Sequence, residues 1–436
     1  MRERGLYAGS QKDECVPLLC ARPYSASNAG VDGRICGDPL HGRAGVSCMS
    51  VQKAAARAGS RRPRALRGER PDKSERMGYY EEVYMKKRGK LLAAVALAGL
   101  AALYPGCAKR TGRIVPLTRN AAGQEVYRLK TWSRLDCGAA PFIVGDKMGF
   151  FTEAGVEIEY TGEVSSPQRI PSMLSGDNDI GGGHPNAIAI ARAGGAHLRG
   201  VATDGIEPDY SETDPHLLHM WWVSNKNGPL KTLDDLKTFP GKIKMQSISR
   251  NQCQEFMTDV LLERLGLPKD KIEYILLPDV EGVLSLKQGL VDIATPHPPF
   301  FQPIEQTGIA NVLITSREIV GLDAGTSLWA FTDEFIENNP EAVGRFVKAI
   351  KKASRWANDH PAQTAKWTEE AIGVPVLANH WYSREAAIDE AGIEVWIDGA
   401  FRGGALEPGT KIAVSDIITH EFEHYGVEEP ETIALR

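Results

Sequence analysis

Two arginines occupy polar loops in separate parts of the chain. Arg134 lies in Ser133–Gly138 and Arg250 lies in Ser247–Gln252. A guanidinium group presents a planar fork of N–H donors that pairs with a carboxylate, sulfonate or phosphate. Arginine is mostly exposed in proteins, so each side chain could instead form a surface ion pair. If the fold brings the two loops together, they predict a site for an anion.

Two histidines stand in copies of one short pattern. Gly, Asp, Ile, His and Pro recur at identical spacing in Gly176–Pro185 and Gly289–Pro298, so that His184 matches His297. Such spacing indicates an internal repeat on the scale of a domain. Chance recurrence of common turn residues is the alternative. Each imidazole could donate a hydrogen bond to a ligand, or could simply cap a helix and pack.

The elements around these loops follow one order twice. The first set is predicted as strand, helix, strand and helix at Tyr127–Trp132, Ala139–Phe151, Val156–Tyr160 and Ser166–Leu174. The second set is predicted in the same order at Ile243–Gln246, Cys253–Leu265, Ile272–Leu276 and Val280–Gln288. In each set a short buried strand and a helix then follow, with Pro185 or Pro298 in the helix's first turn. Two β-α-β-α-β-α units predict an α/β protein with two lobes, each a parallel-type sheet flanked by helices.

Ligands of open α/β sheets bind beyond the carboxyl ends of the strands. Four loops are expected there, namely Ser133–Gly138, Gly181–Asn186, Ser247–Gln252 and Ala294–Pro299. A strand at Ser327–Phe331 adds an aromatic residue. The predicted ligand-binding residues are therefore Ser133, Arg134, Asp136, Gly183, His184, Asn186, Ser247, Ser249, Arg250, Asn251, His297 and Trp329.

Charge divides the chain into a basic beginning and an acidic remainder. The formal net charge is −5, yet residues 1–107 hold 19 Lys and Arg against 10 Asp and Glu. The rest holds 32 against 46, a net charge of −14. An acidic body argues against nucleic acid as a partner and favours an exported protein.

Residues 1–84 lack the pattern of a domain. They are rich in Arg, Gly, Ser and Ala, hold four of the seven cysteines and show no sustained apolar period. A disordered basic tail would explain Arg61–Arg76. We favour another interpretation, in which this segment is upstream DNA translated in error and the natural chain begins at Met85.

From Met85 the sequence is typical of an export signal. Met85–Lys90 is positively charged, and Leu91–Tyr104 is apolar but short for a bilayer span. Gly106 and Cys107 are similar to the end of a bacterial lipoprotein signal, in which the cysteine is lipidated. We therefore expect a membrane-anchored lipoprotein in the periplasm or at the cell surface, with residues 108–125 as a tether. Cleavage without lipidation is the alternative.

The body is expected to cross between its lobes twice. The first crossing is placed at Ser224–Gly228 and the return near Leu322–Phe331. The predicted segments are 126–223 for the first lobe, 224–324 for the second, and 325–436 for the remainder of the first. In the last segment, helices are expected at Pro340 onward, Pro361–Ile372, Ser383–Ala391 and Ile412–His424, all packing on the first lobe.

Several motifs together resemble a known family. Gly149–Gly155 followed by Val156–Ile158 resembles a Gly-Phe-Phe signature, and Asp235–Lys237 followed by Gly241 and Lys242 resembles an entry motif of a second lobe. Further matches are the paired Gly-x-x-Asp elements Gly176–Asp179 and Gly289–Asp292, and the helix start Asn339–Val343. The resemblance is to periplasmic substrate-binding proteins of ABC importers for nitrate, taurine, alkanesulfonates and thiamine-precursor pyrimidines, and it covers roughly residues 126–370.

The resemblance implies a type II periplasmic-binding-protein fold. Such a protein closes its two lobes on a small, here anionic, organic ligand and docks to a permease and ATPase complex; we expect a monomer without enzymatic activity, cofactor or metal. The sequence departs from the family pattern at Gly181–Pro185 and Pro296–Pro299, where histidine and proline crowd the loops. A pyrimidine synthase on the same fold would need a Cys-rich iron-binding run, which the sequence lacks. A sensory ligand-binding module is a further alternative.

One motif is typical of zinc peptidases. His420-Glu421-Phe422-Glu423-His424 is H-E-x-x-H on a predicted helix, an arrangement that could hold zinc beside a general base. The chain after it offers only glutamates as a third ligand, so packing of this helix is the preferred interpretation. Cys137 and Cys253 each stand in or beside a ligand loop. We expect both as filler, because a disulfide between them would join the lobes and oppose their motion.

Overall fold

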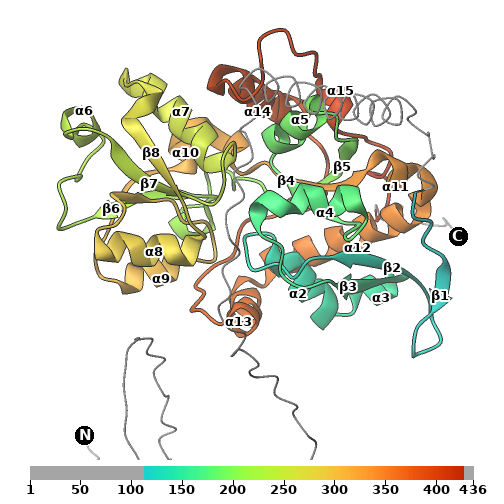
Figure 1. Cartoon of the computed structure of the whole chain (residues 1–436). Coiled ribbons are helices and arrows are strands. Elements are labelled where there is room, and N and C mark those ends of the chain that lie inside the picture. Colours follow the sequence, from blue (N-terminus) through green and yellow to red (C-terminus); the bar gives the residue numbers. More distant parts are fainter. Residues whose placement is uncertain (1–111, 427–436) are drawn as a thin grey trace, which may run out of the picture. The chain divides into compact units, whose positions relative to one another are not determined.

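The structure is a computed structural model that describes residues 112–426 (Figure 1). The chain divides into two units, Met1–Tyr104 and Pro105–Arg436, and every described residue belongs to the second. The predictions for residues 1–84, for the export signal and for Cys107 lie outside the described residues. Within residues 112–426, no helix combines the length and apolar character needed to cross a membrane.

Lobe 1 contains two three-stranded sheets, in the orders β1-β2-β3 and β4-β11-β5. Strands β2 and β3 are parallel, whereas β11 is antiparallel to both of its neighbours. Its strands are β1 (Leu117–Arg119), β2 (Glu125–Thr131), β3 (Val156–Tyr160), β4 (Gly181–Gly183), β5 (Leu198–Thr203) and β11 (Leu328–Thr332). Its helices are α2 (Ala139–Lys147), α3 (Phe150–Glu153), α4 (Arg169–Ser175), α5 (Pro185–Ala193), α11 (Asp333–Asn338), α12 (Pro340–Asp359) and α13 (Pro361–Ile372).

The long helix α12 shows why lobe 1 folds as it does. Its apolar residues recur at helical spacing, and the predicted face of Val343, Phe346, Val347 and Ile350 is fully buried. This face packs in one core with Phe142 and with aromatic residues of β11. The prediction of an amphipathic helix from Pro340 is confirmed.

Lobe 2 is one five-stranded sheet in the order β10-β6-β9-β7-β8. Strand β7 is parallel to β8 and β9, whereas β6 is antiparallel to its neighbours. Its elements are β6 (Trp221–Asn225), α6 (Asp235–Thr238), β7 (Ile243–Ser247), α7 (Cys253–Leu265), β8 (Ile272–Leu276), α8 (Asp279–Gln288), β9 (Ile293–Ala294), α9 (Phe301–Gln306), β10 (Ala310–Thr315) and α10 (Ser316–Val320). In Figure 1 these elements form the left part of the molecule, apart from lobe 1 on the right.

The chain crosses between the lobes before β6, earlier than predicted. The predicted crossing at Ser224–Gly228 is wrong, because β6 already pairs with β9 and β10 of lobe 2. The two crossing segments, residues 204–220 and 316–327, lie side by side. Asp204 N donates to Ser327 O at 2.8 Å, and Ser316 N donates to Met220 O at 2.8 Å. This pairing is typical of a hinge.

The C-terminal helix α14 (Glu390–Gly403) contacts both lobes, since it packs on α5 of lobe 1 and on α7 of lobe 2. Trp396 illustrates this position, because its buried ring stacks on His184 with ring centroids 4.4 Å apart and lies 4.6 Å from the Phe256 ring. The expectation that the C-terminal helices pack on the first lobe alone is therefore wrong for this helix.

Two predicted helices do not form. Residues 383–389 are irregular because their backbone bonds to the first crossing segment and β5, as in Ser383 N to Asp204 O at 2.8 Å and Thr203 N to Ala386 O at 2.9 Å, and helix α14 begins only at Glu390. In place of a helix over Ile412–His424, only α15 (Val414–Ile417) forms, followed by turns. The H-E-x-x-H motif is consequently not on a helix.

Two other helices differ at their ends. The predicted helix Ala139–Phe151 is divided into α2 and α3 by Gly149, whose φ of 72° lies in the left-handed region that glycine tolerates. Helix α9 begins at Phe301 instead of Pro298, because the residue before a proline is disfavoured in helical conformation and Pro299 follows Pro298.

Candidate functional site

Arg134 lies in the loop after β2 with its guanidinium group among aromatic rings. The guanidinium carbon is 4.5 Å from the ring centre of Trp132, 5.0 Å from that of Phe142 and 4.7 Å from that of Trp329. Burial lowers the pKa of Arg134 to about 10. The side chain therefore keeps its positive charge at neutral pH.

Four side chains around this point hold unused hydrogen-bond donors, and we call them the donor cluster: Trp132, Arg134, Arg169 and Trp329. The guanidinium carbon of Arg169 is 5.5 Å from the Trp132 ring centre. Their buried donors without a hydrogen-bond partner among residues 112–426 are Nε1 of Trp132, Nε and Nη2 of Arg134, Nε of Arg169 and Nε1 of Trp329. Buried polar groups are nearly always paired in native proteins. Because all five atoms donate, a group that only accepts would satisfy them.

Two carboxylates border the donor cluster. Asp136 pairs with Nη2 of Arg169 at 2.6 Å, and the two arginines counter the effect of burial, so that the pKa of Asp136 falls below its ordinary value. Asp204 accepts from the Ser327 hydroxyl at 3.3 Å, and its Oδ1 has no partner among the described residues. Burial raises the pKa of Asp204 to about 7, although the Arg134 charge opposes this change.

A second group of buried side chains lies where the lobes meet, and we call it the thiol–imidazole cluster. His219 is its centre, because its ring centroid lies 4.9 Å from that of His184, 5.1 Å from that of His297 and 4.9 Å from that of His380. The Sγ atom of Cys253 lies 3.1 Å from Nε2 of His297. All members are more than nine-tenths buried, and they are His184, His219, Cys253, His297 and His380.

Each lobe contributes to this cluster. His184 precedes helix α5 of lobe 1, and His219 lies near the end of the first crossing segment. Cys253 is the first residue of α7 in lobe 2, and His297 follows β9. The same boundary holds a hydrogen bond from Asn186 Nδ2 to Asn251 O at 3.1 Å.

Charge and burial act in opposite directions on Cys253 and His297. Burial favours the neutral thiol, but the histidines His297 and His184 lower the pKa of Cys253 to about 6. Burial also favours neutral His297, but Asp279, at 3.0 Å from its Nδ1, and Cys253 raise the pKa of His297 well above its ordinary value. The pair therefore favours a thiolate beside an imidazolium.

The predicted site residues fall into several places. Arg134, Asp136 and Trp329 are brought together in or beside the donor cluster; His184 and His297 are brought together with His219; and Asn186 meets Asn251. Gly183 ends β4 just before His184. Ser133 is tied by its backbone N–H to Gly162 O, and Ser247 donates to Ser249 O at 2.8 Å.

Arg250 does not join Arg134 in the donor cluster. Its side chain is 59 % exposed and pairs with Glu255, with Nη2 2.5 Å from Oε1. The guanidinium carbon lies 5.3 Å from the ring centre of Tyr274. The surface ion pair that the sequence left open for each arginine is the arrangement found for Arg250.

Sequence reasoning did not select Trp132, Arg169, Asp204, His219 or His380, and it treated Cys253 as filler. Cys253 carried one usable signal, since it follows a predicted ligand loop at a helix start, where thiolates are favoured. His380 carried none, because it stands outside every predicted element. Cys137 and Cys253 are both free thiols, and no disulfide joins the lobes through them.

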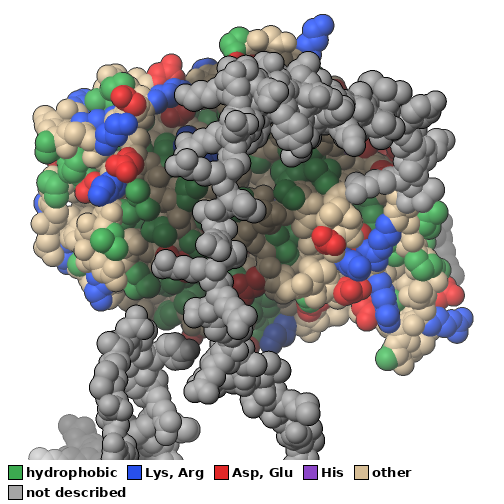
Figure 2. Space-filling model, in the orientation of Figure 1, with side chains coloured by type: hydrophobic (Ala, Val, Ile, Leu, Met, Phe, Trp, Pro, Cys, Tyr) green, Lys and Arg blue, Asp and Glu red, His purple; other side chains and the backbone are tan. Residues whose placement is uncertain are grey.

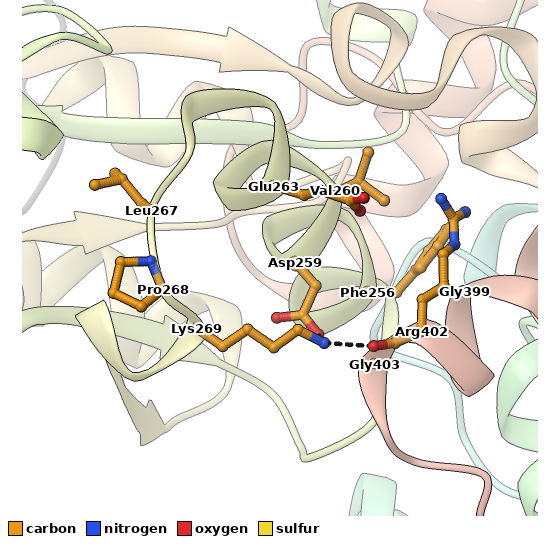
Figure 3. Close-up of a pocket in the computed structure, with 10 residues that line it drawn as sticks. All are labelled: Phe256, Asp259, Val260, Glu263, Leu267, Pro268, Lys269, Gly399, Arg402 and Gly403. Carbon is orange, nitrogen blue, oxygen red and sulfur yellow. Dashed lines mark hydrogen bonds and ion pairs between the residues drawn. The ribbon is translucent and has the colours of Figure 1, made fainter. Parts of the chain in front are cut away.

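A surface pocket is lined by residues that belong to neither cluster (Figure 3). It has a volume of about 360 Å³ and is formed by α7, the turn after it and α14. Lys269 spans it, with Nζ 2.7 Å from Arg402 O and 2.9 Å from Asp259 Oδ2. None of the predicted ligand-binding residues lines this pocket, so we do not assign the solute to it.

Charged and hydrophobic side chains lie in different parts of the face drawn in Figure 2. Lys and Arg (blue) and Asp and Glu (red) are interspersed on its outer parts, whereas hydrophobic side chains (green) gather in its recessed middle. This face therefore has no broad positive patch, and the body as a whole is acidic, so attraction of an anionic solute must come from local groups.

The comparisons with known proteins agree with this architecture. Residues 137–364, more than half of the chain, match a family described as NMT1/THI5 like. Among curated proteins, the sequence matches none.

Several solved structures share the fold at low sequence identity. The nitrate-binding protein NrtA of Synechocystis PCC 6803 has a TM-score of 0.56 at 13 % identity, over 68 % of this chain and 87 % of that one. A zinc-bound ligand-binding component of an ABC-type import system from Staphylococcus aureus has a TM-score of 0.55 at 12 % identity, over 68 % of this chain and 98 % of that one. The alkanesulfonate-binding protein SsuA of Xanthomonas axonopodis pv. citri, bound to MOPS, has a TM-score of 0.54 at 15 % identity, over 67 % of this chain and 98 % of that one.

These similarities show a two-lobed fold of the type II periplasmic-binding-protein class, as the sequence predicted. The family match covers the end of the Arg134 loop, all of lobe 2 and all of helix α12. The chain belongs to the NMT1/THI5-like family.

Proposed function

We propose that this protein is the solute-binding component of an ABC import system and holds one small anionic organic molecule between its lobes. The observation that carries the proposal is the donor cluster, in which five buried N–H donors from four side chains lack a partner among residues 112–426. A carboxylate, sulfonate or phosphate only accepts hydrogen bonds, and its charge is matched by Arg134, because Arg169 is already paired with Asp136.

The surroundings of Arg134 favour an organic anion over a bare inorganic one. Three aromatic rings lie within 5.0 Å of its guanidinium carbon. Ligand sites commonly combine a few polar groups with such apolar cover, which contacts the carbon skeleton of the ligand. The anionic group would then meet the donors while the rest of the molecule lies against the rings.

The lobes supply the motion that a transport cycle needs. Lobe 1 carries the donor cluster. Lobe 2 contacts lobe 1 through hydrogen bonds such as that from Asn186 to Asn251. The paired crossing segments act as the hinge. Closure buries the solute, and the closed form is the one presented to the permease.

The comparisons support the transport assignment. The similar structures include a component of an ABC-type import system and proteins that bind nitrate and an alkanesulfonate, which are anions. By this analogy the partners are a membrane permease and its ATPase, and the protein acts without catalysis. Delivery to a permease distinguishes this function from a sensory module, in which the closed form would contact a receptor.

Anchoring is a separate part of the proposal. Cys107 at the end of an apolar segment is the proposed lipidation site, which would tether a monomeric binding protein to the membrane. Cells producing Cys107→Ser should release the protein into soluble fractions. If the wild-type protein is equally soluble in cells, the lipid anchor is wrong.

Thermal-shift measurements with matched ligand pairs test the main proposal. The pairs share a carbon skeleton and differ in charge, for example butanesulfonate, butyrate or butyl phosphate against butylamine, with nitrate as the inorganic member. We expect at least one organic anion to raise the melting temperature, because a ligand that binds only the folded state stabilises it. If the amines raise it and the anions do not, the anion assignment is wrong.

A further inference from the structure

Three residues of the thiol–imidazole cluster place metal-ligand atoms close together. One ring nitrogen of His184, one of His219 and the Sγ atom of Cys253 all lie within 4.8 Å of one another. All three residues are buried, with exposed fractions of 8 %, 0 % and 1 %. Their assembly is due to the fold, because they come from the start of α5, the first crossing segment and the start of α7.

The contacts of His184 leave one of its ring nitrogens with a lone pair toward the cluster. Its Nδ1 lies 2.7 Å from the carbonyl oxygen of Thr326, which can only accept, so Nδ1 carries the hydrogen. Nε2 of a neutral His184 is then unprotonated. The stacked Trp396 ring, inclined by 6° to the imidazole, fixes its plane.

A relay of hydrogen bonds sets His219 in the same way. His380 Nδ1 lies 2.7 Å from Trp381 O and must donate to it, which leaves His380 Nε2 as an acceptor. His219 Nδ1 lies 2.7 Å from that Nε2 and therefore donates. His219 Nε2 is then a bare lone pair, fully buried, with no hydrogen-bond partner among the described residues. Metal-bound histidines are typically oriented by such a contact at their other nitrogen.

The third ligand atom has an adjacent proton acceptor. Cys253 Sγ lies 3.1 Å from Nε2 of His297, whose Nδ1 lies 3.0 Å from Asp279 Oδ2 and donates to it. A cysteine, a histidine and a carboxylate in this order also occur in thiol nucleophiles. That function would leave the unpartnered Nε2 of His219 unexplained, whereas a metal ion uses it together with a ring nitrogen of His184.

We propose that His184, His219 and Cys253 bind one transition-metal ion of borderline softness, with Zn²⁺ as the first candidate, where the two lobes meet. Two imidazole nitrogens and a thiolate suit Zn²⁺ or copper and do not suit Mg²⁺ or Ca²⁺. Ligand atoms of tetrahedral zinc lie about 3.3–3.6 Å apart, so shifts of about 1 Å would complete the site. On binding, the Cys253 thiolate forms the sulfur–metal bond, and the proton that the thiol has given up stays on His297 Nε2, 3.1 Å from the sulfur.

The site lies across the boundary between the lobes and would couple the metal to closure. His184 belongs to lobe 1 and Cys253 to lobe 2, so the ion can be fully held only when the lobes are together. The inference goes beyond the proposed function and does not rest on it, because the metal alone is the probe and no solute is needed.

The test uses the full chain, freed of metal by a chelator and kept reduced. After equilibration with Zn²⁺ and removal of excess ion, elemental analysis should find about one zinc per chain. Co²⁺ is a spectroscopic substitute for Zn²⁺. It should give the intense visible bands of tetrahedral cobalt and a near-ultraviolet charge-transfer band from a thiolate.

Variants identify the ligands. Cys253→Ser should abolish the charge-transfer band, and His219→Gln should weaken Zn²⁺ binding by more than about 100-fold, since loss of an outer-shell partner alone costs 10–100-fold. Cys137→Ser removes the other cysteine of the described residues, and the pair His420→Gln with His424→Gln disrupts H-E-x-x-H. Both controls should keep the metal and the band.

Two outcomes would overturn the inference. One is wild-type protein that retains no Zn²⁺ and gives no thiolate band with Co²⁺, a result that requires no variant to fold. The other is Cys253→Ser and His219→Gln binding Zn²⁺ as tightly as the wild type, with melting curves showing that both are folded. Loss of metal in the H-E-x-x-H control would place the ion there instead and would equally overturn it.

Discussion

The guanidinium carbon of Arg134 lies 4.7 Å from the centre of the Trp329 ring, although one residue follows the second strand of the chain and the other lies on the last. The contact exists because β11 returns to lobe 1 and joins the sheet beside β4. Arg134 thereby gains an apolar wall, and both side chains keep unused donors. The donor cluster of lobe 1 is thus complete only when the chain has crossed to lobe 2 and come back.

The first prediction concerns stability and Asp204. Burial raises the pKa of this carboxyl from 3.8 to about 7, so the folded protein binds a proton that the unfolded chain has released between these values. The free energy of unfolding should therefore fall as pH rises from about 4 to 7 and become level above, by at most about 4 kcal/mol from this group. Asp204→Asn should lack this component. Denaturant titrations at several pH values measure it; equal slopes for both proteins would contradict the assigned pKa.

The second prediction concerns the affinity for an anion. The groups facing Asp204 include Arg134, Asp136, His184, Cys137, Tyr382 and Ser327. An ionised Asp204 competes with an anionic solute for the charge of Arg134, whereas the neutral acid does not. Affinity should therefore weaken as pH rises above about 7, and Asp204→Asn should flatten this dependence. Calorimetry across this range, with an anion found by thermal shift, measures the dependence, and an affinity that stays level or rises above pH 7 would contradict the prediction.

A third prediction concerns the contact between helix α14 and lobe 2. A Cβ added at Gly399 would lie 2.0 Å from a ring atom of Phe256, so Gly399→Ala should destabilise the protein by about 1–3 kcal/mol. Gly403→Ala on the same helix is the matched control, because its nearest atom is 3.3 Å away at the end of the Asp259 side chain. It should change stability by less than about 1 kcal/mol. Equal melting temperatures for the two variants would refute this packing.

The fourth prediction concerns H-E-x-x-H. The motif lies in turns, and both ring nitrogens of His420 are already engaged, Nε2 with Glu390 at 2.9 Å and Nδ1 with Glu423 at 3.0 Å. We expect no peptidase activity from the wild type or from a His420→Ala, His424→Ala variant. Cleavage of unfolded substrate protein by the wild type, lost in the variant, would show that the motif is catalytic.

Much of the fold could be predicted because the bounds of many helices and strands follow from short-range sequence patterns. Strands β3 and β8 and helices α7 and α13 have the predicted bounds, since each combines its own periodicity with Gly or Pro at an end. The residues of Ser383–Ala391 are compatible with the predicted helix. The helix does not form there because the backbone of this segment makes hydrogen bonds with Thr203 and Asp204. Pairing between residues so distant in the chain leaves no periodic signal.

The site was predictable only in part, for the same reason. Arg134 and His184 were found because they follow strands of a repeat, where ligand loops occur. His219 lies in the first crossing segment and His380 in an irregular stretch after α13, and their side chains are hydrogen-bonded. Neither residue belongs to a sequence motif that would have predicted this contact. Arg250 was predicted to join Arg134 because the loops of the two residues match, but Glu255, five residues later, pairs with Arg250 at the surface.

The most direct test of the central claim is the affinity of Arg134→Ala for an organic anion that the wild type binds, measured by calorimetry beside Arg250→Ala. Loss of a charge-assisted contact from a desolvated site should cost about 1.5–3 kcal/mol, or roughly ten- to a hundred-fold in affinity. We expect that loss for Arg134→Ala, and a smaller one for the exposed Arg250→Ala. If Arg134→Ala is folded and binds the anion as tightly as the wild type, the donor cluster is not the binding site.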